Sequence, residues 1–272
     1  MENDIAVYCE KKEYLDLSRK IIRFIWYTDL ESDIFFELVQ DTHKSKVYRF
    51  SHDKTNYYLK YYTPIAFNKI IKNQFREIEA LRHYNTARGL QSAGIPSVNP
   101  VLAIIKKNNL FYKESILVME EIEGLTLEDY LRKPRPADNI KNEIIKQFAG
   151  IYAKLINNKY LHQDPMFCNF MIKGKDEDSI EIVLIDVDNI YKLPFFTKRM
   201  IVYSLVKFNN LVLYDLNNLN LQYPDEEDIK YFIRKMLEEC NHSLNERELL
   251  DTILKKSAKR IVELNGNKYK QI

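Results

Sequence analysis

The first half of the chain alternates short runs of β-branched and aromatic residues with polar turns. Residues 33–40, 45–52 and 56–62 are such runs, and their lengths and spacing predict three antiparallel strands. Residues 100–122 hold two further apolar runs around a polar turn, which is typical of a hairpin. Together these segments predict an antiparallel sheet, with a short additional strand over residues 4–8.

Helical periodicity is found in two stretches of the first half and in most of the second half of the chain. Apolar positions recur at helical spacing over residues 14–30 and again over residues 67–94, where a glycine and a nearby proline end the longer helix. Residues 140–160 form an amphipathic stretch, and helical sequence follows from residue 195 onward. The second half is therefore predicted to be mainly helical, apart from short apolar strands at residues 170–172 and 180–186.

These elements predict an α+β protein with two lobes. Residues 1–120 would form an antiparallel sheet with one long helix inserted after its third strand. Residues 121–272 would form a mainly helical lobe. The boundary is placed at about residues 120–125, where strand-like segments give way to mainly helical ones.

The composition fits an ordinary globular protein. The chain has 272 residues, of which 46% are hydrophobic and 29% charged, enough to build a sizeable core. A net charge of only +2 gives the chain no strong attraction to the phosphates of nucleic acid, so no nucleic-acid partner is expected. Three cysteines provide no disulfide framework and fit a reducing cytosol. The charged N-terminus and the lack of an apolar run of about 18 residues predict neither a signal peptide nor a spanning helix.

Three polar residues accompany the two short strands of the second half. Asp164 and Asn169 lie in a loop before the first strand, and Asp186 closes the second. Because a short turn joins the strands, the three side chains should lie together. Asn169 and Asp186 offer the oxygen ligands that Mg²⁺ prefers, and Asp164 would orient a hydroxyl and accept its proton. The spacing Asp-x4-Asn, followed by a later Asp, matches the protein-kinase motifs and indicates phosphoryl transfer from ATP.

The first half offers a phosphate-binding lysine. Lys60 lies in the third strand of the sheet, flanked by aromatic residues, where a kinase keeps the Lys that binds ATP phosphates. Its partner carboxylate is expected on the long helix, and Glu77 and Glu79 are the candidates. Small and apolar residues follow Glu77 at +3 and +4, whereas Arg and His follow Glu79, as on a solvated face. We therefore predict that Glu77 pairs with Lys60.

Two further segments would contact the nucleotide. The loop between the first two sheet strands contains no glycine, so Ser45 and its flanking lysines would serve in place of a glycine-rich phosphate loop. The last strand of the sheet would run into a hinge, with Met119 behind the adenine. The backbone of Glu120 and Ile122 would then bond to the adenine edge.

The sequence departs from a protein kinase in ways that concern the acceptor. Gln163 stands where protein kinases have Arg before the catalytic Asp, and no A-P-E motif follows. Only residues 189–199 separate the second strand and its turn from the next helix. So short a segment provides no platform for a peptide, which favours a sugar or another small hydroxyl acceptor over a protein substrate.

The chain resembles the lipopolysaccharide core kinases, bacterial members of the kinase-like fold that phosphorylate heptose or Kdo sugars. The likeness covers most of the chain and is most specific in "DPMFCNFMI" and "VLIDVDN", whereas "SAGI" and "EEIEG" are shared more widely. Within the family, the likeness is strongest to the heptose(II) kinase branch. The resemblance implies transfer of the ATP γ-phosphate to a sugar hydroxyl of lipid-linked core oligosaccharide, at the cytoplasmic face of the inner membrane.

The resemblance also implies roles for individual residues. Lys60 would bind phosphates and pair with Glu77, Asp164 would be the base, and Asn169 and Asp186 would bind Mg²⁺. An anionic lipid-linked acceptor would favour cations near the membrane, and two helices could lie on its surface. Their cationic residues are Lys69, Lys72, Arg76, Arg82 and Arg88 on one helix, and Lys255, Lys256, Lys259 and Arg260 on the other.

Two alternatives remain open from the sequence. One is a phosphotransferase of the aminoglycoside or choline kinase type, whose cationic acceptor would require an acidic pocket. The other is a pseudokinase, a binding module that has kept the fold. The glycine-free loop and Gln163 favour the pseudokinase, whereas the intact set of candidate catalytic residues favours an enzyme.

Overall fold

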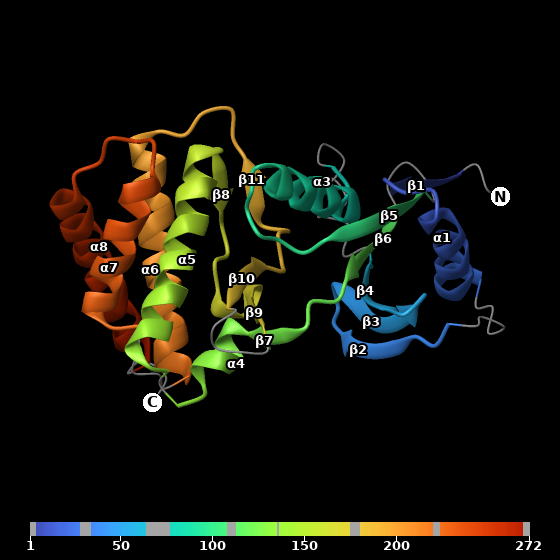
Figure 1. Cartoon of the computed structure of the whole chain (residues 1–272), viewed down its shortest axis with the longest axis horizontal. Helices are drawn as coiled ribbons and strands as arrows, with labels where there is room; N and C mark the ends of the chain where they lie inside the picture. Colours follow the sequence, from blue (N-terminus) through green and yellow to red (C-terminus); the bar gives the residue numbers. More distant parts are fainter. Residues whose placement is uncertain are drawn as a thin grey trace. The chain divides into compact units, whose positions relative to one another are not determined.

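The computed structural model describes most of the chain as two compact units. Its backbone description covers residues 4–27, 34–63, 77–107, 113–134, 136–174, 180–219 and 224–268, and it leaves out the side chains of residues 107, 113 and 258–268. Unit 1 comprises Met1–Gly89 and Val98–Ile122, and unit 2 comprises Leu90–Ser97 and Glu123–Ile272 (Figure 1). The assignment of nucleotide binding to residues 1–120 and of catalysis to residues 121–272 stays a prediction.

Unit 1 is built on a six-stranded antiparallel sheet in the order β1-β5-β6-β4-β3-β2. The predicted strands and hairpin are confirmed, and β3 begins and ends at the predicted residues. In the register of the sheet, Lys60 lies opposite Val47 on one side and Leu117 on the other. The strands are β1 (Ile5–Cys9), β2 (Glu37–Asp41), β3 (Ser45–His52), β4 (Thr55–Tyr62), β5 (Pro100–Lys107) and β6 (Lys113–Glu120).

The first helix of unit 1 changes its winding before its predicted end. Helix α1 (Tyr14–Ile22) contributes two fully buried side chains to the core against the sheet. The sequence predicts one helix over residues 14–30, but the chain continues as a wider π turn, Arg23–Tyr27. In that turn Phe24 stacks on Phe36 with ring centroids 4.0 Å apart, so aromatic packing accompanies the wider winding.

The long helix of unit 1 begins later than the sequence predicts. Helix α3 (Glu79–Ser92) ends close to the predicted glycine, and residues 64–76 lie outside the described residues. Glu77 and Ile78 are not helical, and the Ile78 carbonyl accepts the hydrogen bond of the first turn from the Arg82 N–H at 2.8 Å. Glu77 therefore precedes the helix that was expected to carry it.

Unit 2 is mainly helical and holds two small antiparallel sheets, β10-β9-β7 and β11-β8. The long helices and the pair β9–β10 were predicted. Strands β7, β8 and β11 have three residues each, too few for an alternating pattern to show in the sequence. The elements are β7 (Gly124–Thr126), α4 (Leu127–Leu131), α5 (Asp138–Asn157), β8 (Tyr160–His162), a 3₁₀ turn (Phe167–Asn169), β9 (Phe170–Lys173), β10 (Glu181–Leu184), β11 (Ile190–Lys192), α6 (Lys198–Leu219), α7 (Glu226–Glu239) and α8 (Glu246–Lys268).

An aromatic cluster connects the helices of unit 2 to strand β9. Phe148 of α5 lies 4.5 Å from Phe170 of β9, measured between ring centroids, and Phe208 of α6 lies 5.2 Å from Phe232 of α7. Each such pair contributes roughly 0.5–1.5 kcal/mol beyond its buried area. Phe170 directly follows Asn169, so the cluster anchors one end of the loop that carries the candidate catalytic residues.

Gly124 has no room for a side chain, because a Cβ would lie 2.1 Å from the carbonyl oxygen of Ile172. We expect Gly124→Ala to lower the free energy of unfolding by about 1–3 kcal/mol, since the backbones of β7 and β9 must separate. Gly150→Ala is a matched control, because its Cβ would meet only the flexible carboxylate of Glu239, at 3.3 Å. Alanine there should be neutral or stabilising by about 0.5–1 kcal/mol. Denaturant unfolding of both variants measures the difference, and an unaffected Gly124→Ala would contradict the close approach.

Candidate active site

The loop between β8 and β9 fixes the backbone of Asp164 at both of its polar groups. The Asp164 N–H donates to His162 Nδ1 at 3.3 Å. The Asp164 carbonyl accepts from the side-chain amide of Asn169 at 2.7 Å and from the Met166 N–H at 2.9 Å. The five-residue spacing therefore has a structural reason: it lets the Asn169 amide close the loop on the residue that carries the candidate base.

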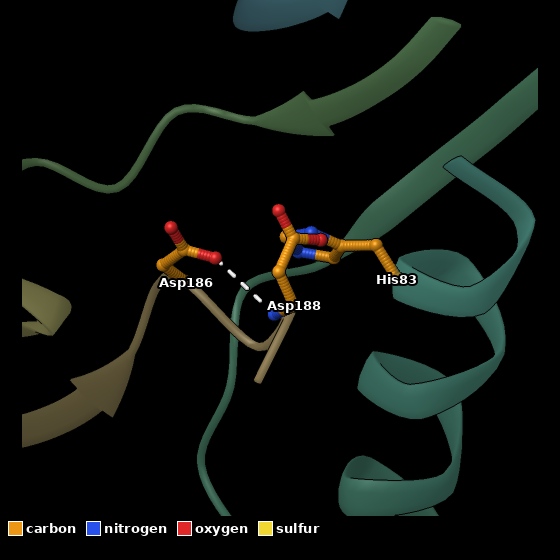
Figure 2. Close-up of side chains that lie close together, drawn as sticks. All are labelled: His83, Asp186 and Asp188. Carbon is orange, nitrogen blue, oxygen red and sulfur yellow. Dashed lines mark hydrogen bonds between the residues drawn. The ribbon is translucent and has the colours of Figure 1, made fainter. Parts of the chain in front are cut away.

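The third member of the constellation is joined to this loop through the backbone. The Ile185 N–H donates to the Asn169 carbonyl at 3.0 Å, immediately before Asp186. Asp186 follows β10 and accepts the Asp188 N–H on Oδ1 at 3.2 Å, which orders the turn after the strand (Figure 2). The structure thus brings Asp164, Asn169 and Asp186 together within unit 2.

The donor set around Asn169 fits a hard cation. The side-chain nitrogen of Asn169 donates to the Asp164 backbone carbonyl. The side-chain oxygen Oδ1 is therefore the atom that remains to act as a ligand. Cys168 Sγ lies 3.6 Å from this oxygen. Burial, followed by the charges of nearby carboxylates, raises the pKa of the Cys168 thiol to about 11, so no thiolate competes at neutral pH. An amide oxygen and the Asp186 carboxylate suit Mg²⁺ better than a thiophilic metal.

His162 supports the loop as a buried neutral ring. It is 1% exposed, and burial lowers its pKa to about 3, with a smaller contribution from Lys207. Because the ring stays neutral and Nδ1 accepts from Asp164, its proton lies on Nε2, which has no hydrogen-bond partner in the described part of the chain. The sequence placed His162 beside the motif but gave it no role.

Asp215 is a second supporting residue, and the sequence analysis missed it. It lies on α6, is 5% exposed, and accepts the Phe167 N–H of the 3₁₀ turn on Oδ2 at 3.0 Å. Burial raises the pKa of its carboxyl, the bond from Phe167 lowers it, and the charges of Glu128 and Asp164 raise it further. Nothing in the local sequence signals this contact, because 48 residues separate the two partners.

In unit 1, Lys60 lies mid-strand on β4, half-buried, with Nζ 5.1 Å from the centre of the Tyr62 ring. Glu77 is exposed, and its carboxylate accepts a hydrogen bond from the Asn85 side chain at 2.5 Å. Glu79 begins α3 and is half-buried. The predicted pairing of Glu77 with Lys60 stays a prediction, and Glu79 now competes for the role because it lies in the helix.

The glycine-free loop between β2 and β3 is a tight turn closed by Thr42. The Thr42 hydroxyl accepts from the N–H groups of Lys44 and Ser45, at 3.3 and 3.1 Å, and donates to the Ser45 carbonyl at 2.9 Å. Lys46 forms an ion pair with Asp41 at 3.2 Å. The backbone N–H groups of Lys44 and Ser45 are thus already bonded within the turn.

The predicted hinge follows β6. Met119 is 9% exposed, and the Glu120 N–H donates to the Asn99 carbonyl at 3.0 Å. Ile122 is half-buried. Glu121, which has no predicted role, accepts two hydrogen bonds from Arg49 on its carboxylate: Nε to Oε1 at 3.0 Å and Nη2 to Oε2 at 2.9 Å. This bidentate pair fixes the end of β6 to β3.

The cationic residues predicted for membrane contact are only partly described. Lys255 and Lys256 are exposed on α8, whereas Arg88 forms an ion pair with Glu10. Others lie outside the described residues, in whole or in their side chains: Lys69, Lys72, Arg76, Lys259 and Arg260. Within the described ranges, every helix is too short or too polar to cross a bilayer.

An Asp-x4-Asn loop with a neighbouring Asp in one unit, and a lysine-bearing antiparallel sheet in the other, define a kinase-like phosphotransferase. The chain belongs to the lipopolysaccharide kinase (Kdo/WaaP) family, whose model matches residues 32–208. This confirms the resemblance found in the sequence. The protein is accordingly a kinase of lipopolysaccharide biosynthesis that uses a hydroxyl group as its phosphate acceptor.

A solved structure supports the fold. The structure described as WaaP in complex with acyl carrier protein matches with a TM-score of 0.65 and 16% sequence identity. The match covers 93% of this chain and 98% of that chain, so the kinase-like fold extends over nearly the whole sequence. No curated protein matches the chain in sequence.

The buried ring of His162 should make stability depend on acidity. A depressed folded-state pKa contributes stability that is present above pH 6.5 and is lost as pH falls toward about 3. The loss approaches about 1.4 kcal/mol per pH unit for one proton. His162→Asn retains an acceptor near Nδ1 and cannot titrate, so its unfolding free energy should fall less steeply over this range. Denaturant unfolding at several pH values measures both slopes, and equal slopes would contradict the assignment.

Asp215 should affect catalysis through the loop rather than through ATP binding. Asp215→Ala leaves the Phe167 N–H without its acceptor, so we expect kcat to fall at least about tenfold with little change in the KM for ATP. Asp215→Asn keeps an acceptor oxygen and should retain most of kcat.

The same pair of proteins tests the charge of Asp215. A raised carboxyl pKa means that the wild type loses stability from this group as pH rises through the folded-state pKa, a loss that the Asn variant lacks. The stability of Asp215→Asn relative to the wild type should therefore increase with pH. Equal kcat for both Asp215 variants, or a KM effect alone, would contradict the positioning role.

Proposed function

We propose that this protein transfers the γ-phosphate of ATP to a heptose or Kdo hydroxyl of the lipopolysaccharide core, with heptose as the favoured acceptor. The observation that carries the proposal is the closed loop joining Asp164, Asn169 and Asp186, in a chain of the Kdo/WaaP family. Heptose is favoured over Kdo because the sequence motifs resemble the heptose(II) branch most. The acceptor is expected to be linked to lipid.

Asp164 acts as the base in this proposal. The sugar oxygen attacks the γ-phosphorus, the bond from phosphorus to the β–γ bridging oxygen breaks, and ADP leaves. Asp164 orients the hydroxyl and accepts its proton, which then passes to solvent. The two hydrogen bonds to the Asp164 carbonyl and the one from its N–H to His162 restrict the backbone, so the carboxylate is positioned before substrate binds.

Asn169 and Asp186 would ligate Mg²⁺ through their side-chain oxygens. The chemistry that the ion would supply there is neutralisation of the negative charge on the phosphates. The chain itself presents the ligands together, because the Ile185 N–H fixes the Asn169 carbonyl beside the start of the Asp186 turn. The protonated Cys168 thiol leaves the oxygen ligands without a competing thiolate.

Lys60 would bind the ATP phosphates, with Glu77 as its proposed partner and Glu79 as the alternative on α3. Met119, Glu120 and Ile122 would contact the adenine. Ser45 would contribute its hydroxyl near the phosphates, since its N–H is engaged by Thr42. The closed turn predicts weaker phosphate binding by loop amides than a glycine-rich loop provides, which leaves more of that role to Lys60.

The alternative within enzymes is a phosphotransferase acting on an aminoglycoside, choline or a similar cationic alcohol. The family assignment favours the sugar acceptor, and it favours an enzyme over the pseudokinase considered from the sequence. A peripheral contact with the membrane is part of the proposal, because the acceptor is linked to lipid.

Two variants separate chemistry from nucleotide binding. Asp164→Asn should lower kcat by about 10²–10⁴-fold, as expected for loss of a general base, while the protein still gains thermal stability with Mg²⁺-ATP. Asp186→Asn should lose most of that gain, which in the wild type is about 2.7 kcal/mol at a hundredfold excess over Kd. Asp251→Asn, an exposed carboxylate on α8, is the control and should match the wild type in both measurements.

Activity is measured as ATP-dependent phosphorylation of deacylated core oligosaccharides that end in heptose or in Kdo. Phosphorus NMR identifies the modified hydroxyl, and choline and an aminoglycoside serve as competing acceptors. Phosphorylation of the cationic alcohols alone would overturn the sugar proposal. An unchanged kcat in Asp164→Asn would overturn the assigned base.

A further inference from the structure

An exposed aromatic pair lies where helix α6 begins in unit 2. Phe195, in the segment between β11 and α6, is 61% exposed, and Tyr203, one turn into α6, is 54% exposed. Leu193 N–H donates to the Lys159 carbonyl at 2.9 Å, and Lys159 Nζ donates to the Pro194 carbonyl at 3.4 Å, so the segment is fixed to the end of α5. Exposed hydrophobic side chains that gather in one region of the surface can mark a contact site, whereas isolated ones are normal.

Cationic residues lie close to these aromatic residues along the chain and in the segment fixed to Lys159. Lys159, Lys192, Lys198 and Arg199 are all exposed, and Arg199 shares a helical stripe with Tyr203 at i and i+4. We call the surface made by these residues the Phe195 patch; its members are Lys159, Lys192, Phe195, Lys198, Arg199 and Tyr203.

The acidic groups at the same end of unit 2 are largely paired. In Figure 1 this is the end where α5 and α7 finish and α6 and α8 begin. Glu248 of α8 forms an ion pair with Lys198 at 3.6 Å, and Glu246 pairs with Arg234 at 3.4 Å. Glu239 at the end of α7 contributes its carbonyl to Asn157 and leaves its carboxylate exposed. Lys159, Lys192 and Arg199 therefore keep the Phe195 patch cationic.

The cations at the start of α6 do not serve the helix itself. A helix N-terminus carries partial positive charge and favours acidic residues. The other described α-helices have an acidic residue in their first turn, whereas α6 begins with Lys198 and Arg199 and has none. A surface that combines these cations with exposed aromatic rings suits an anionic bilayer, where rings insert at the interface and cations contact lipid phosphates.

We propose that the Phe195 patch docks unit 2 on an anionic lipid bilayer. Docking would give the kinase access to a lipid-linked acceptor, and this purpose rests on the proposed function; the contact itself does not require catalysis. The observation that carries the proposal is the exposed Phe195 in a segment with several exposed cations and no acidic residue.

Two other surfaces of the chain lack this combination. Phe35 in unit 1 is even more exposed, at 82%, but Asp33 and Glu37 flank it in the sequence, so an anionic bilayer would repel its surroundings. Lys255 and Lys256 on α8 are exposed cations, but no large hydrophobic side chain is exposed among the described side chains of that helix. These positions therefore provide matched controls.

Sedimentation with vesicles tests the proposal in the absence of ATP and acceptor. The full chain should bind vesicles of phosphatidylcholine mixed with phosphatidylglycerol, and bind pure phosphatidylcholine at least about tenfold more weakly. Phe195→Ser should weaken binding to anionic vesicles about tenfold or more, and so should the double variant Lys198→Gln/Arg199→Gln. Phe35→Ser and Lys255→Gln/Lys256→Gln should bind like the wild type.

Salt and kinase assays complete the test. Binding should weaken as salt rises from about 0.1 M to about 1 M, where the Debye length falls from about 10 Å to about 3 Å. Phe195→Ser should phosphorylate a soluble acceptor at the wild-type rate and a vesicle-bound acceptor more slowly. Absent vesicle binding with intact kinase activity would overturn the docking surface alone. Loss confined to the Lys255/Lys256 variant, or to Phe35→Ser, would overturn it in favour of another surface.

Discussion

The active-site half of this protein depends on one hydrogen bond, from the side-chain amide of Asn169 to the carbonyl of Asp164. It closes a five-residue loop on itself, so Asn169 shapes the loop, and its side-chain oxygen Oδ1 is the atom proposed to bind a metal. Three further hydrogen bonds hold the loop. The Met166 N–H donates to the Asp164 carbonyl, the Ile185 N–H donates to the Asn169 carbonyl, and the Asp164 N–H donates to His162 Nδ1. A charged carboxylate that must meet a substrate hydroxyl within hydrogen-bonding distance needs such restriction, because an error of about 1 Å costs much of the rate.

Buried polar groups provide this restriction at a cost in stability. His162 is held neutral inside the unit, with its Nε2 lacking a partner in the described part of the chain, and Asp215 is a buried carboxylate whose pKa burial raises. Neither arrangement favours folding by itself, since buried polar groups lose their hydration. Both residues instead bond to the backbone N–H of a loop residue, Asp164 or Phe167, and so support its shape.

The turn between β2 and β3 differs in its hydrogen bonding from a glycine-rich phosphate loop. Thr42 bonds to the amides that a kinase would normally turn toward phosphate, and this closes the turn between β2 and β3. Elsewhere in this sheet, Arg49 joins β3 to Glu121, which follows β6, through a bidentate ion pair. Under the proposed function, this closed turn leaves more of the phosphate binding to Lys60 and less to the loop amides.

The sequence by itself determined the strands of the main sheet, the long helices, and the order of Lys60, Asp164, Asn169 and Asp186, because each depends on local periodicity or on a short fixed spacing. It also identified the family. It did not reveal β7, β8 and β11, whose three residues are too few to show a pattern, nor the start of α3 at Glu79, because the helical spacing of apolar residues continues upstream of it. The contact of Asp215 with Phe167 and the neutral state of His162 were decided by tertiary structure alone. Each depends on burial or on partners brought together by folding, and neither is encoded in the spacing of neighbouring residues.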